Sequence, residues 1–225
     1  MHNTDNIKEL LINEFKNGNI KETKLGVKTV ELQNVQFFAD KDHILREPNY
    51  DYAKREIEWY KSQSLNVYDI KGNVPEIWKQ CADVNGDINS NYGWMIYSKE
   101  NGSQFNNCLW QLVNDPATRE AVMIYNRPSM HIDAISNHKK DFCCTFSVQC
   151  FLNPYKDGYK LKYIVYQRSQ DAVFGFNNDI LWHMHVYNEL LDELNNKLTS
   201  PVYKDNIICN VGSLHVYERH FKFLS

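Results

Sequence analysis

Four short segments in the second half of the chain bring together side chains that can do chemistry. They contain Cys143-Cys144-Thr145 with Gln149, Gln167-Arg168-Ser169 with Asp171, Gly175 with Asn178-Asp179, and His215 with Tyr217. A thiolate is a nucleophile, an arginine binds phosphate through two parallel hydrogen bonds, and a carboxyl whose pKa is raised by burial can transfer a proton. Taken alone, each segment also has a structural interpretation: a core cysteine, a solvated Arg-Ser strand edge, or an aspartate that caps a helix.

The elements that must position these segments follow from hydrophobic periodicity and turn residues. Helices are predicted over residues 5–16, 51–63, 103–113 and 178–198, with a shorter one that begins at Pro75 and includes Trp78. Strands are predicted over 27–38, 121–125, 142–152, 160–166 and 213–225, with Asp157-Gly158 as a hairpin turn. Long crossovers together with a hairpin indicate an α+β fold in which helices cover one mixed sheet. Because no linker or repeat interrupts the chain, residues 1–225 are expected to form a single domain.

The composition excludes several classes of protein. With 43% hydrophobic and 13% aromatic residues, the chain is neither disordered nor a collagen or coiled coil. Its 25 basic and 28 acidic residues give a net charge of −3, so no direct contact with nucleic acid is expected. No apolar stretch reaches the roughly 18 residues that a membrane span needs, and the N-terminus MHNTDNIKELL lacks a signal-peptide pattern. We therefore expect a cytoplasmic protein without membrane contact.

The six cysteines have no C-x-x-C spacing, so no metal site is expected. In a reducing compartment they are free thiols, and most of them are small core residues. The question that they raise is whether one of them is a nucleophile.

Together and in this order, these segments resemble the thymidylate synthase family. That family carries a Glu three residues before a Trp, NGD…YG, DPxxR, a Cys five residues before a Gln, QRSxD with a following Gly, and a terminal HxY. This sequence carries Glu56 with Trp59, Asn85-Gly86-Asp87 with Tyr92-Gly93, Asp115-Pro116 with Arg119, Cys144 with Gln149, Gln167-Arg168-Ser169 with Asp171, Gly175, and His215 with Tyr217. More narrowly, EWYKSQSL, INSNYGW, MIYNRPSM, VFGFNND and NVGSLHVYERHF resemble the deoxycytidylate hydroxymethylase branch of T-even bacteriophages.

The resemblance implies one-carbon transfer to a pyrimidine nucleotide. Cys144 is then the thiolate that adds to carbon 6 of the ring, so that carbon 5 can attack the co-substrate 5,10-methylenetetrahydrofolate. Glu56 acts through ordered water, both in proton transfer around the base and in activating the water that ends the hydroxymethylase reaction. Tyr92 belongs to the hydrogen-bond network near the base. For Glu56, an exposed helix carboxylate is the structural alternative.

Asp179 is the most informative residue for the choice of base. Uracil offers an N3–H donor and an O4 acceptor, which an Asn amide satisfies, whereas cytosine reverses both. A protonated Asp can donate to N3 and accept from the N4 amino group, so a carboxyl here favours cytosine. Thymidylate synthases proper have Asn where this chain has Asp179, and His where it has Thr145. A helix cap is the structural alternative for Asp179, and the two roles could coexist.

The resemblance also implies the remaining contacts. The phosphate-binding residues are Arg168, Ser169, Arg119 and Lys24, the base- and sugar-binding residues are Asp179, Asn178, Gln149, His215 and Tyr217, and the folate-binding residues are Trp78 and Asp171. Trp78 has core packing as its alternative. Family members are homodimers that pack through a sheet face and lend arginines to the partner's phosphate site. Arg119 fits that role, although Glu120 stands where a second Arg is usual.

Two further expectations concern the backbone. Strand alternation places Cys144 and Gln149 on opposite faces, so both can meet the nucleotide only if a bulge intervenes. Family members continue beyond the His-x-Tyr strand with a tail that closes over the folate, whereas this sequence ends at Ser225. The tail that closes over the folate is then absent, replaced by another segment, or missing from a shortened sequence.

The sequence therefore predicts a homodimeric enzyme, a deoxycytidylate 5-hydroxymethyltransferase. It would convert dCMP, 5,10-methylenetetrahydrofolate and water into 5-hydroxymethyl-dCMP and tetrahydrofolate, in the host cytoplasm if the chain is phage-encoded. The resemblance implies modified DNA as the purpose and allows other phage nucleotide-synthesis enzymes as partners. One alternative is a synthase or hydroxymethylase acting on dUMP. Another is a catalytically idle relative that binds protein or RNA, against which the intact Cys144, Glu56, Arg168 and Asp179 argue.

Overall fold

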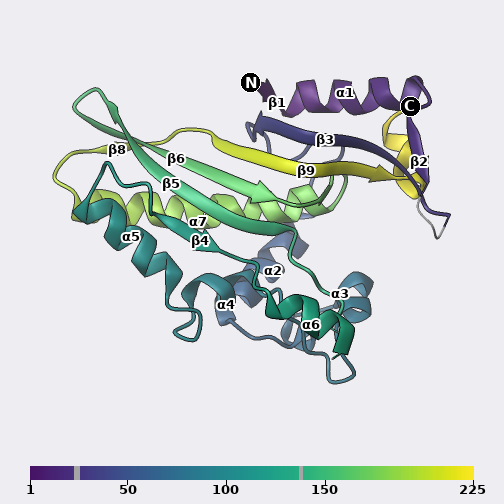
Figure 1. The fold of residues 1–225 in the computed structure, drawn as a ribbon, viewed down its shortest axis with the longest axis horizontal. Helices are drawn as coiled ribbons and strands as arrows, with labels where there is room; N and C mark the ends of the chain where they lie inside the picture. The colour runs from purple at the N-terminus through teal and green to yellow at the C-terminus, as the bar shows by residue number, and fades with distance from the viewer. Residues whose placement is uncertain (23–25, 137–138) are drawn as a thin grey trace. The chain divides into compact units, whose positions relative to one another are not determined.

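The computed structural model of the chain describes residues 1–22, 26–136 and 139–225 (Figure 1). The chain divides into two compact units. The first unit comprises Met1–Asn49 and Leu152–Ser225, and the second comprises Tyr50–Phe151. Each unit buries apolar residues of its own.

The first unit is built on a mixed sheet. Its strands are β1 (His2–Asn3), β2 (Ile20–Glu22), β3 (Lys28–Phe38), β6 (Gly158–Gln167), β7 (Gln170–Asp171), β8 (Val202–Tyr203) and β9 (Ile207–Tyr217). The order β1-β3-β9-β6 pairs β3 with β9 antiparallel and β9 with β6 parallel. In β6, Leu161, Tyr163 and Val165 are fully buried at alternate positions, as a strand with one face on the core requires. The predicted α+β fold with a mixed sheet is confirmed.

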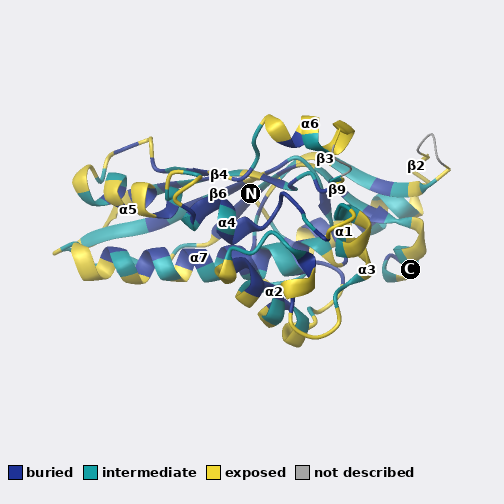
Figure 2. Ribbon diagram, turned by 90° about the horizontal axis from the view of Figure 1, so that it is seen from below, coloured by how far each residue is buried: buried dark blue, intermediate teal, exposed yellow. Residues whose placement is uncertain are grey.

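Helix α7 (Gly175–Lys197) packs on this sheet (Figure 1). Its buried residues recur at spacings of three and four, which places them on one side of the helix: Phe176, Ile180, His183, Tyr187, Leu190 and Leu194. The Phe176 ring lies 5.7 Å from the Phe37 ring of β3, and the Tyr187 hydroxyl donates to the Leu161 carbonyl of β6 at 3.3 Å. Figure 2 shows buried and exposed residues alternating along α7, as expected for a helix that covers a sheet.

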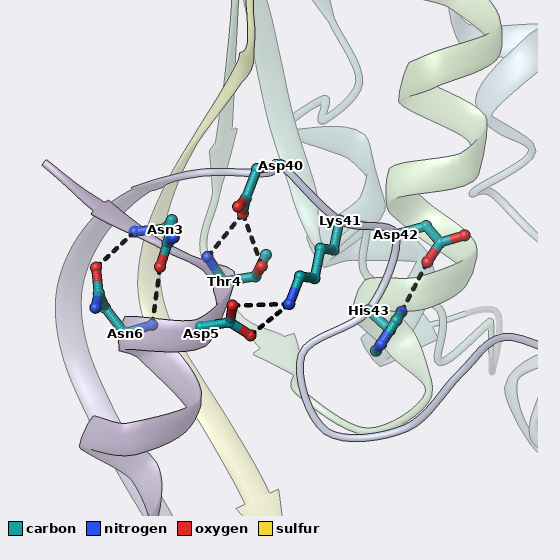
Figure 3. A network of polar contacts seen from close by, with 8 residues as sticks. All are labelled: Asn3, Thr4, Asp5, Asn6, Asp40, Lys41, Asp42 and His43. Atoms are coloured by element: carbon teal, nitrogen blue, oxygen red, sulfur yellow. Dashed lines mark hydrogen bonds and ion pairs between the residues drawn. The ribbon is translucent and has the colours of Figure 1, made fainter.

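The N-terminal helix α1 (Thr4–Lys16) is fixed at its start by polar contacts, shown in Figure 3. A reciprocal pair of hydrogen bonds between Asn3 and Asn6 caps the helix. The backbone N–H and hydroxyl of Thr4 both donate to Asp40, at 3.0 and 2.7 Å. These bonds tie the first turn of α1 to the loop that follows β3.

The second unit is mostly helical. It contains α2 (Tyr50–Ser62), the 3₁₀ turn η1 (Val67–Asp69), α3 (Glu76–Cys81), α4 (Tyr92–Tyr97), α5 (Gln104–Asn114), α6 (Ser129–Ser136), β4 (Val122–Ile124) and the first part of β5 (Thr145–Tyr155). Strands β4 and β5 are antiparallel, with Val122 opposite Gln149. A Cβ built on Gly93 would lie 1.9 Å from the carbonyl oxygen of Tyr60, so glycine is required where α4 meets the backbone of α2.

Several predicted boundaries are wrong, and the helix predicted over 178–198 begins earlier, at Gly175. The strand expected over 142–152 begins at Thr145. The hairpin turn is Lys156-Asp157, because Gly158 already belongs to β6, where a Cβ would lie 2.0 Å from the carbonyl oxygen of Pro201. The last predicted strand, 213–225, begins earlier, at Ile207, and ends at Tyr217, and Glu218–Phe223 form the 3₁₀ helix η2.

The residues of η2 show why an alternating pattern was misleading there. The Phe221 ring packs 5.0 Å from the Phe15 ring of α1, and Leu224, three residues on, is 1% exposed. A spacing of three is the period of a 3₁₀ helix rather than that of a strand. Within the described residues, no helix is long and apolar enough to cross a membrane.

Candidate active site

In the second unit, Glu56 is held by two side chains. It lies on α2, only 4% exposed, and its Oε1 accepts hydrogen bonds from the Tyr52 hydroxyl and from the Trp78 indole N–H, the latter at 2.9 Å. The same indole N–H lies 3.0 Å from the Tyr52 hydroxyl oxygen. The exposed carboxylate considered for Glu56 from sequence is therefore wrong. Trp78, half-buried against the Trp59 ring at 5.2 Å, has a polar role besides packing.

Burial is the main cause that raises the pKa of Glu56 above its usual 4.5, and the bonds from Tyr52 and Trp78 act in the opposite direction. The folded protein therefore holds this proton more tightly than the unfolded chain does. The free energy of unfolding therefore falls as the pH rises from about the pKa of Glu56 in the unfolded chain through its pKa in the folded protein.

We expect Glu56→Gln to raise the Tm by about 2–4 °C at pH 8, with a smaller gain near the unfolded pKa, because it removes a buried charge. Turnover should fall by about 10²–10⁴-fold. Glu58→Gln, on the same helix but exposed, is the matched control and should change neither quantity. Differential scanning calorimetry over a pH series measures the first effect. An equal Tm for Glu56→Gln and the native protein at pH 8 would contradict it.

Tyr92 connects α2 to the segment that carries the candidate nucleophile. Its ring stacks on Tyr60 at 5.3 Å, one helical turn after Glu56, and meets Tyr125 edge-on at 5.1 Å. Its hydroxyl oxygen accepts a hydrogen bond from the backbone N–H of Thr145 at 3.3 Å. The structure therefore brings Tyr92 to the residue that directly follows Cys144.

Cys144 itself lies half-buried in a bend just before β5. Strand alternation consequently does not apply between Cys144 and Gln149, and the bulge expected between them is not needed. A doubled contact occurs just after the neighbouring strand β4 instead, where the N–H groups of Tyr125 and Asn126 both donate to the Phe146 carbonyl, at 2.8 and 3.3 Å.

The other thiols are less suited to nucleophilic attack. Burial raises the pKa of Cys81, Cys150 and Cys209, the last to about 12 with a further contribution from the Asp179 carboxylate. A raised pKa keeps the thiol protonated, whereas the thiolate is the reactive form. Cys143 and Cys108 are 2% and 1% exposed and belong to the buried core. Cys144 therefore remains the candidate.

Asp141 fixes the loop before Tyr92, and sequence analysis missed it. One of its carboxylate oxygens, Oδ2, accepts from the backbone N–H groups of Asn89 and Ser90 and from the Ser90 hydroxyl at 2.8 Å. Asp141 is three residues before Cys144, so it ties the nucleophile's segment to the loop that leads into α4. A buried carboxylate with several backbone donors has no sequence signature beyond its charge.

Gln149 and Arg119, both predicted to bind the nucleotide, meet in the second unit. The Gln149 side-chain amide donates to the Arg119 carbonyl at 3.0 Å. Arg119 and the neighbouring Glu120 are exposed. The Gln149 amide thus fixes the backbone of the segment that presents the Arg119 guanidinium.

In the first unit, Arg168 directly follows β6, and Ser169 separates it from β7. The N–H of Ser213 donates to the Arg168 carbonyl at 3.1 Å. A Cβ on Gly212 would lie 2.8 Å from that carbonyl oxygen, so glycine at 212 lets the two segments approach. Arg168 and Ser169 are both half-buried, and the backbone of Arg168 is fixed by β9.

His215 and Tyr217 lie on the same side of β9, with their rings 4.8 Å apart. Burial lowers the pKa of His215, while the carboxylates of Asp171 and Glu31 act in the opposite direction. Both carboxylates belong to residues paired with His215 across the sheet. A neutral imidazole can donate and accept, which suits a sugar hydroxyl.

Asp171, predicted near the folate, also has a structural role. Its carboxylate accepts from the backbone N–H groups of Val173 and Phe174, at 3.1 and 3.4 Å, in the turn that leads into α7. Asn178 and Asp179 are half-buried in the first two turns of α7, whose N-cap is Phe174. The helix-cap interpretation of Asp179 is therefore wrong.

The structure thus forms two groups of predicted residues, one within each unit. The second unit contains Glu56 with Trp78, Tyr92 beside the Cys144 segment, and Gln149 with Arg119; the first contains Arg168, Ser169, Asp171, Asn178, Asp179, His215 and Tyr217. Lys24 lies outside the described residues. Among the residues that are described, no group of three or more His, Cys, Asp or Glu side chains could hold a metal ion.

Comparison with known proteins shows the family to which the chain belongs. A sequence model of the family described as "Thymidylate synthase" matches residues 6–225. The deoxycytidylate 5-hydroxymethyltransferases of Enterobacteria phages T4 and T2 are each 46% identical to this chain over 199 residues, which cover 88% of this chain and 79% of theirs. A solved structure of thermostable thymidylate synthase A from Bacillus subtilis superposes with a TM-score of 0.70 at 20% identity, covering 99% of this chain and 82% of that one. The chain therefore belongs to the thymidylate synthase family of one-carbon transferases.

Proposed function

We propose that this chain is a deoxycytidylate 5-hydroxymethyltransferase with 5,10-methylenetetrahydrofolate as co-substrate. The observation that carries the proposal is the 46% identity to phage enzymes of that name over 88% of the chain. Asp179 supports it, because a carboxyl can satisfy the N3 and N4 edge of cytosine, whereas an Asn amide satisfies uracil. Asp179 lies half-buried in the second turn of α7, beyond the helix cap at Phe174.

The proposed reaction begins at Cys144. Its thiolate forms a bond to carbon 6 of dCMP, and the electron pair displaced from the double bond lets carbon 5 attack the methylene group. Asp179 protonates N3 as the ring becomes electron-rich. Carbon 5 then loses its proton and tetrahydrofolate leaves, so that an exocyclic methylene group remains on the ring.

Water completes the reaction in this proposal. Glu56 takes a proton from a water molecule, whose oxygen bonds to the exocyclic methylene carbon. Electrons return through the ring, N3 gives its proton back to Asp179, the bond from carbon 6 to sulfur breaks, and the Cys144 thiolate is regenerated. No hydride leaves the folate, so the folate product is tetrahydrofolate. The burial of Glu56 favours its role as a base, because a carboxyl with a raised pKa accepts a proton more readily.

The binding roles are part of the same proposal. Arg168 and Ser169 bind the phosphate, His215 and Tyr217 bind the sugar, Asn178 and Gln149 contact the nucleotide, and Trp78 and Asp171 contact the folate. We further propose that residues 1–225 act as one domain and that two copies form a homodimer in which Arg119 serves the partner's phosphate site. Lys24 is proposed as a further phosphate contact.

The experiment is to incubate the protein with dCMP or dUMP and isotopically labelled methylenetetrahydrofolate in ¹⁸O-enriched water. We expect 5-hydroxymethyl-dCMP that carries the labelled carbon and ¹⁸O, with tetrahydrofolate as the second product. Mass spectrometry identifies the nucleotide, and the absorbance of the folate distinguishes tetrahydrofolate from dihydrofolate. Turnover of dUMP without turnover of dCMP would reject the proposal in favour of a dUMP-directed enzyme.

A further inference from the structure

We propose that Tyr52 is a positioning residue for the water-activating carboxylate. The inference rests on the proposed function, in which Glu56 takes a proton from water. Tyr52 lies four residues before Glu56 on α2, which places the two side chains on the same face of the helix. The Tyr52 hydroxyl donates to Oε1 of Glu56 and lies 3.0 Å from the Trp78 indole nitrogen.

The geometry makes the two oxygens of Glu56 unequal. The hydroxyl of Tyr52 and the indole N–H of Trp78 both donate to Oε1, so neither of these bonds holds Oε2. Two donors on one oxygen fix the plane of the carboxylate. Oε1 is therefore the anchored oxygen, and Oε2 is the oxygen that takes the proton from water.

Tyr52 also supports the charge on Glu56. Burial disfavours the ionised carboxylate, and the bonds from Tyr52 and Trp78 favour it. Burial and the nearby Glu56 raise the pKa of Tyr52 well above its usual value, so its hydroxyl keeps its proton and donates it to Glu56, while its oxygen accepts from the Trp78 indole N–H. The guanidinium of Arg55 is the charged group that faces the Tyr52 ring, 5.5 Å from its centre. The Tyr52 hydroxyl thus favours the ionised form of Glu56 against the effect of burial.

The variant Tyr52→Phe tests the inference, because it removes the hydroxyl and keeps the ring. We expect the pKa of Glu56 to rise by about one unit, since a hydrogen bond to the charged form is lost. The measurement is a ¹³C NMR titration of protein labelled at the glutamate carboxyl carbons, with Glu56→Gln to assign the signal. Tyr68→Phe, at an exposed tyrosine outside the site, is the control and should leave the titration unchanged.

Steady-state kinetics supply the second readout. For Tyr52→Phe we expect the acidic limb of the kcat profile to move to higher pH by the same amount, with KM for dCMP nearly unchanged and kcat recovering as the pH is raised. An unshifted titration of Glu56 would overturn the inference. The titration needs no substrate, so it decides the role of Tyr52 even if the protein fails to convert dCMP, which would instead reject the proposed function.

Discussion

Cys144→Ser should lower the hydroxymethylation of dCMP by about 10⁴-fold or more, as is typical when a covalent nucleophile is lost. The serine hydroxyl is far less acidic than a thiol, so it offers almost no anion to attack carbon 6. Tyr92 and the backbone of Thr145 would still form their hydrogen bond, because it does not involve the sulfur. Turnover measured with labelled folate reports the loss. Nucleotide binding measured by calorimetry should change little.

The matched control is Cys81→Ser, at another half-buried cysteine of the second unit. Burial raises the pKa of the Cys81 thiol, so we expect this variant to retain activity. A fluorinated substrate, 5-fluoro-dCMP, cannot lose its carbon 5 substituent as a proton, so with folate it should leave a covalent adduct. Peptide mapping should place this adduct on Cys144. Full activity of Cys144→Ser would disprove the covalent mechanism.

Asp179→Asn should change the preference between dCMP and dUMP by about 10³-fold or more in kcat/KM, in favour of dUMP. The amide would offer its NH₂ to O4 of uracil and its oxygen to N3–H, and would leave the N3 and N4 edge of cytosine without matching partners. Buried polar groups left unpaired in the complex with the wrong base are the physical source of such large ratios. Competition between the two nucleotides in one reaction mixture measures the ratio directly.

Asp192→Asn makes the same chemical change at an exposed position of α7 and should leave the preference unaltered. Loss of dCMP turnover without any gain with dUMP would still be consistent with proton transfer by Asp179. An unchanged ratio of kcat/KM values would show that another residue recognises the base.

The regular elements were largely predictable because each one carries a periodic apolar pattern. The predicted helices at 5–16, 51–63 and 103–113 and the strand at 27–38 lie within one or two residues of α1, α2, α5 and β3. The short helices α4 and α6 were missed. Tyr92–Tyr97 has aromatic residues at nearly every other position, yet its start is fixed by Asn91, whose side chain accepts from the Trp94 N–H. Such a cap decides between helix and strand where six residues are too few for a period to show.

The residues of the candidate site were predicted from the order of their motifs. The hydrogen bonds that fix their side chains and backbone could not be predicted. Gln149 donates to a backbone carbonyl, and Asp171 caps a turn, although sequence alone indicated only ligand contacts for both. Asp141 serves the loop at Asn89 and Ser90, about 50 residues away in the chain, a pairing that local sequence does not encode. Tyr52 could have been found, because a tyrosine four residues before a candidate base on a helix shares its face.

The close approach of α4 to α2 at Gly93 restricts how this part of the protein can diverge. Any L-side chain would place its first carbon inside the normal contact distance of the Tyr60 carbonyl oxygen, so the helices would have to separate. Tyr92 precedes Gly93 and stacks on Tyr60, and Glu56 lies one turn away on α2. Substitutions near the carboxylate must therefore leave a glycine at position 93. A deep mutational scan should reveal position 93 as intolerant, although it offers no functional group of its own.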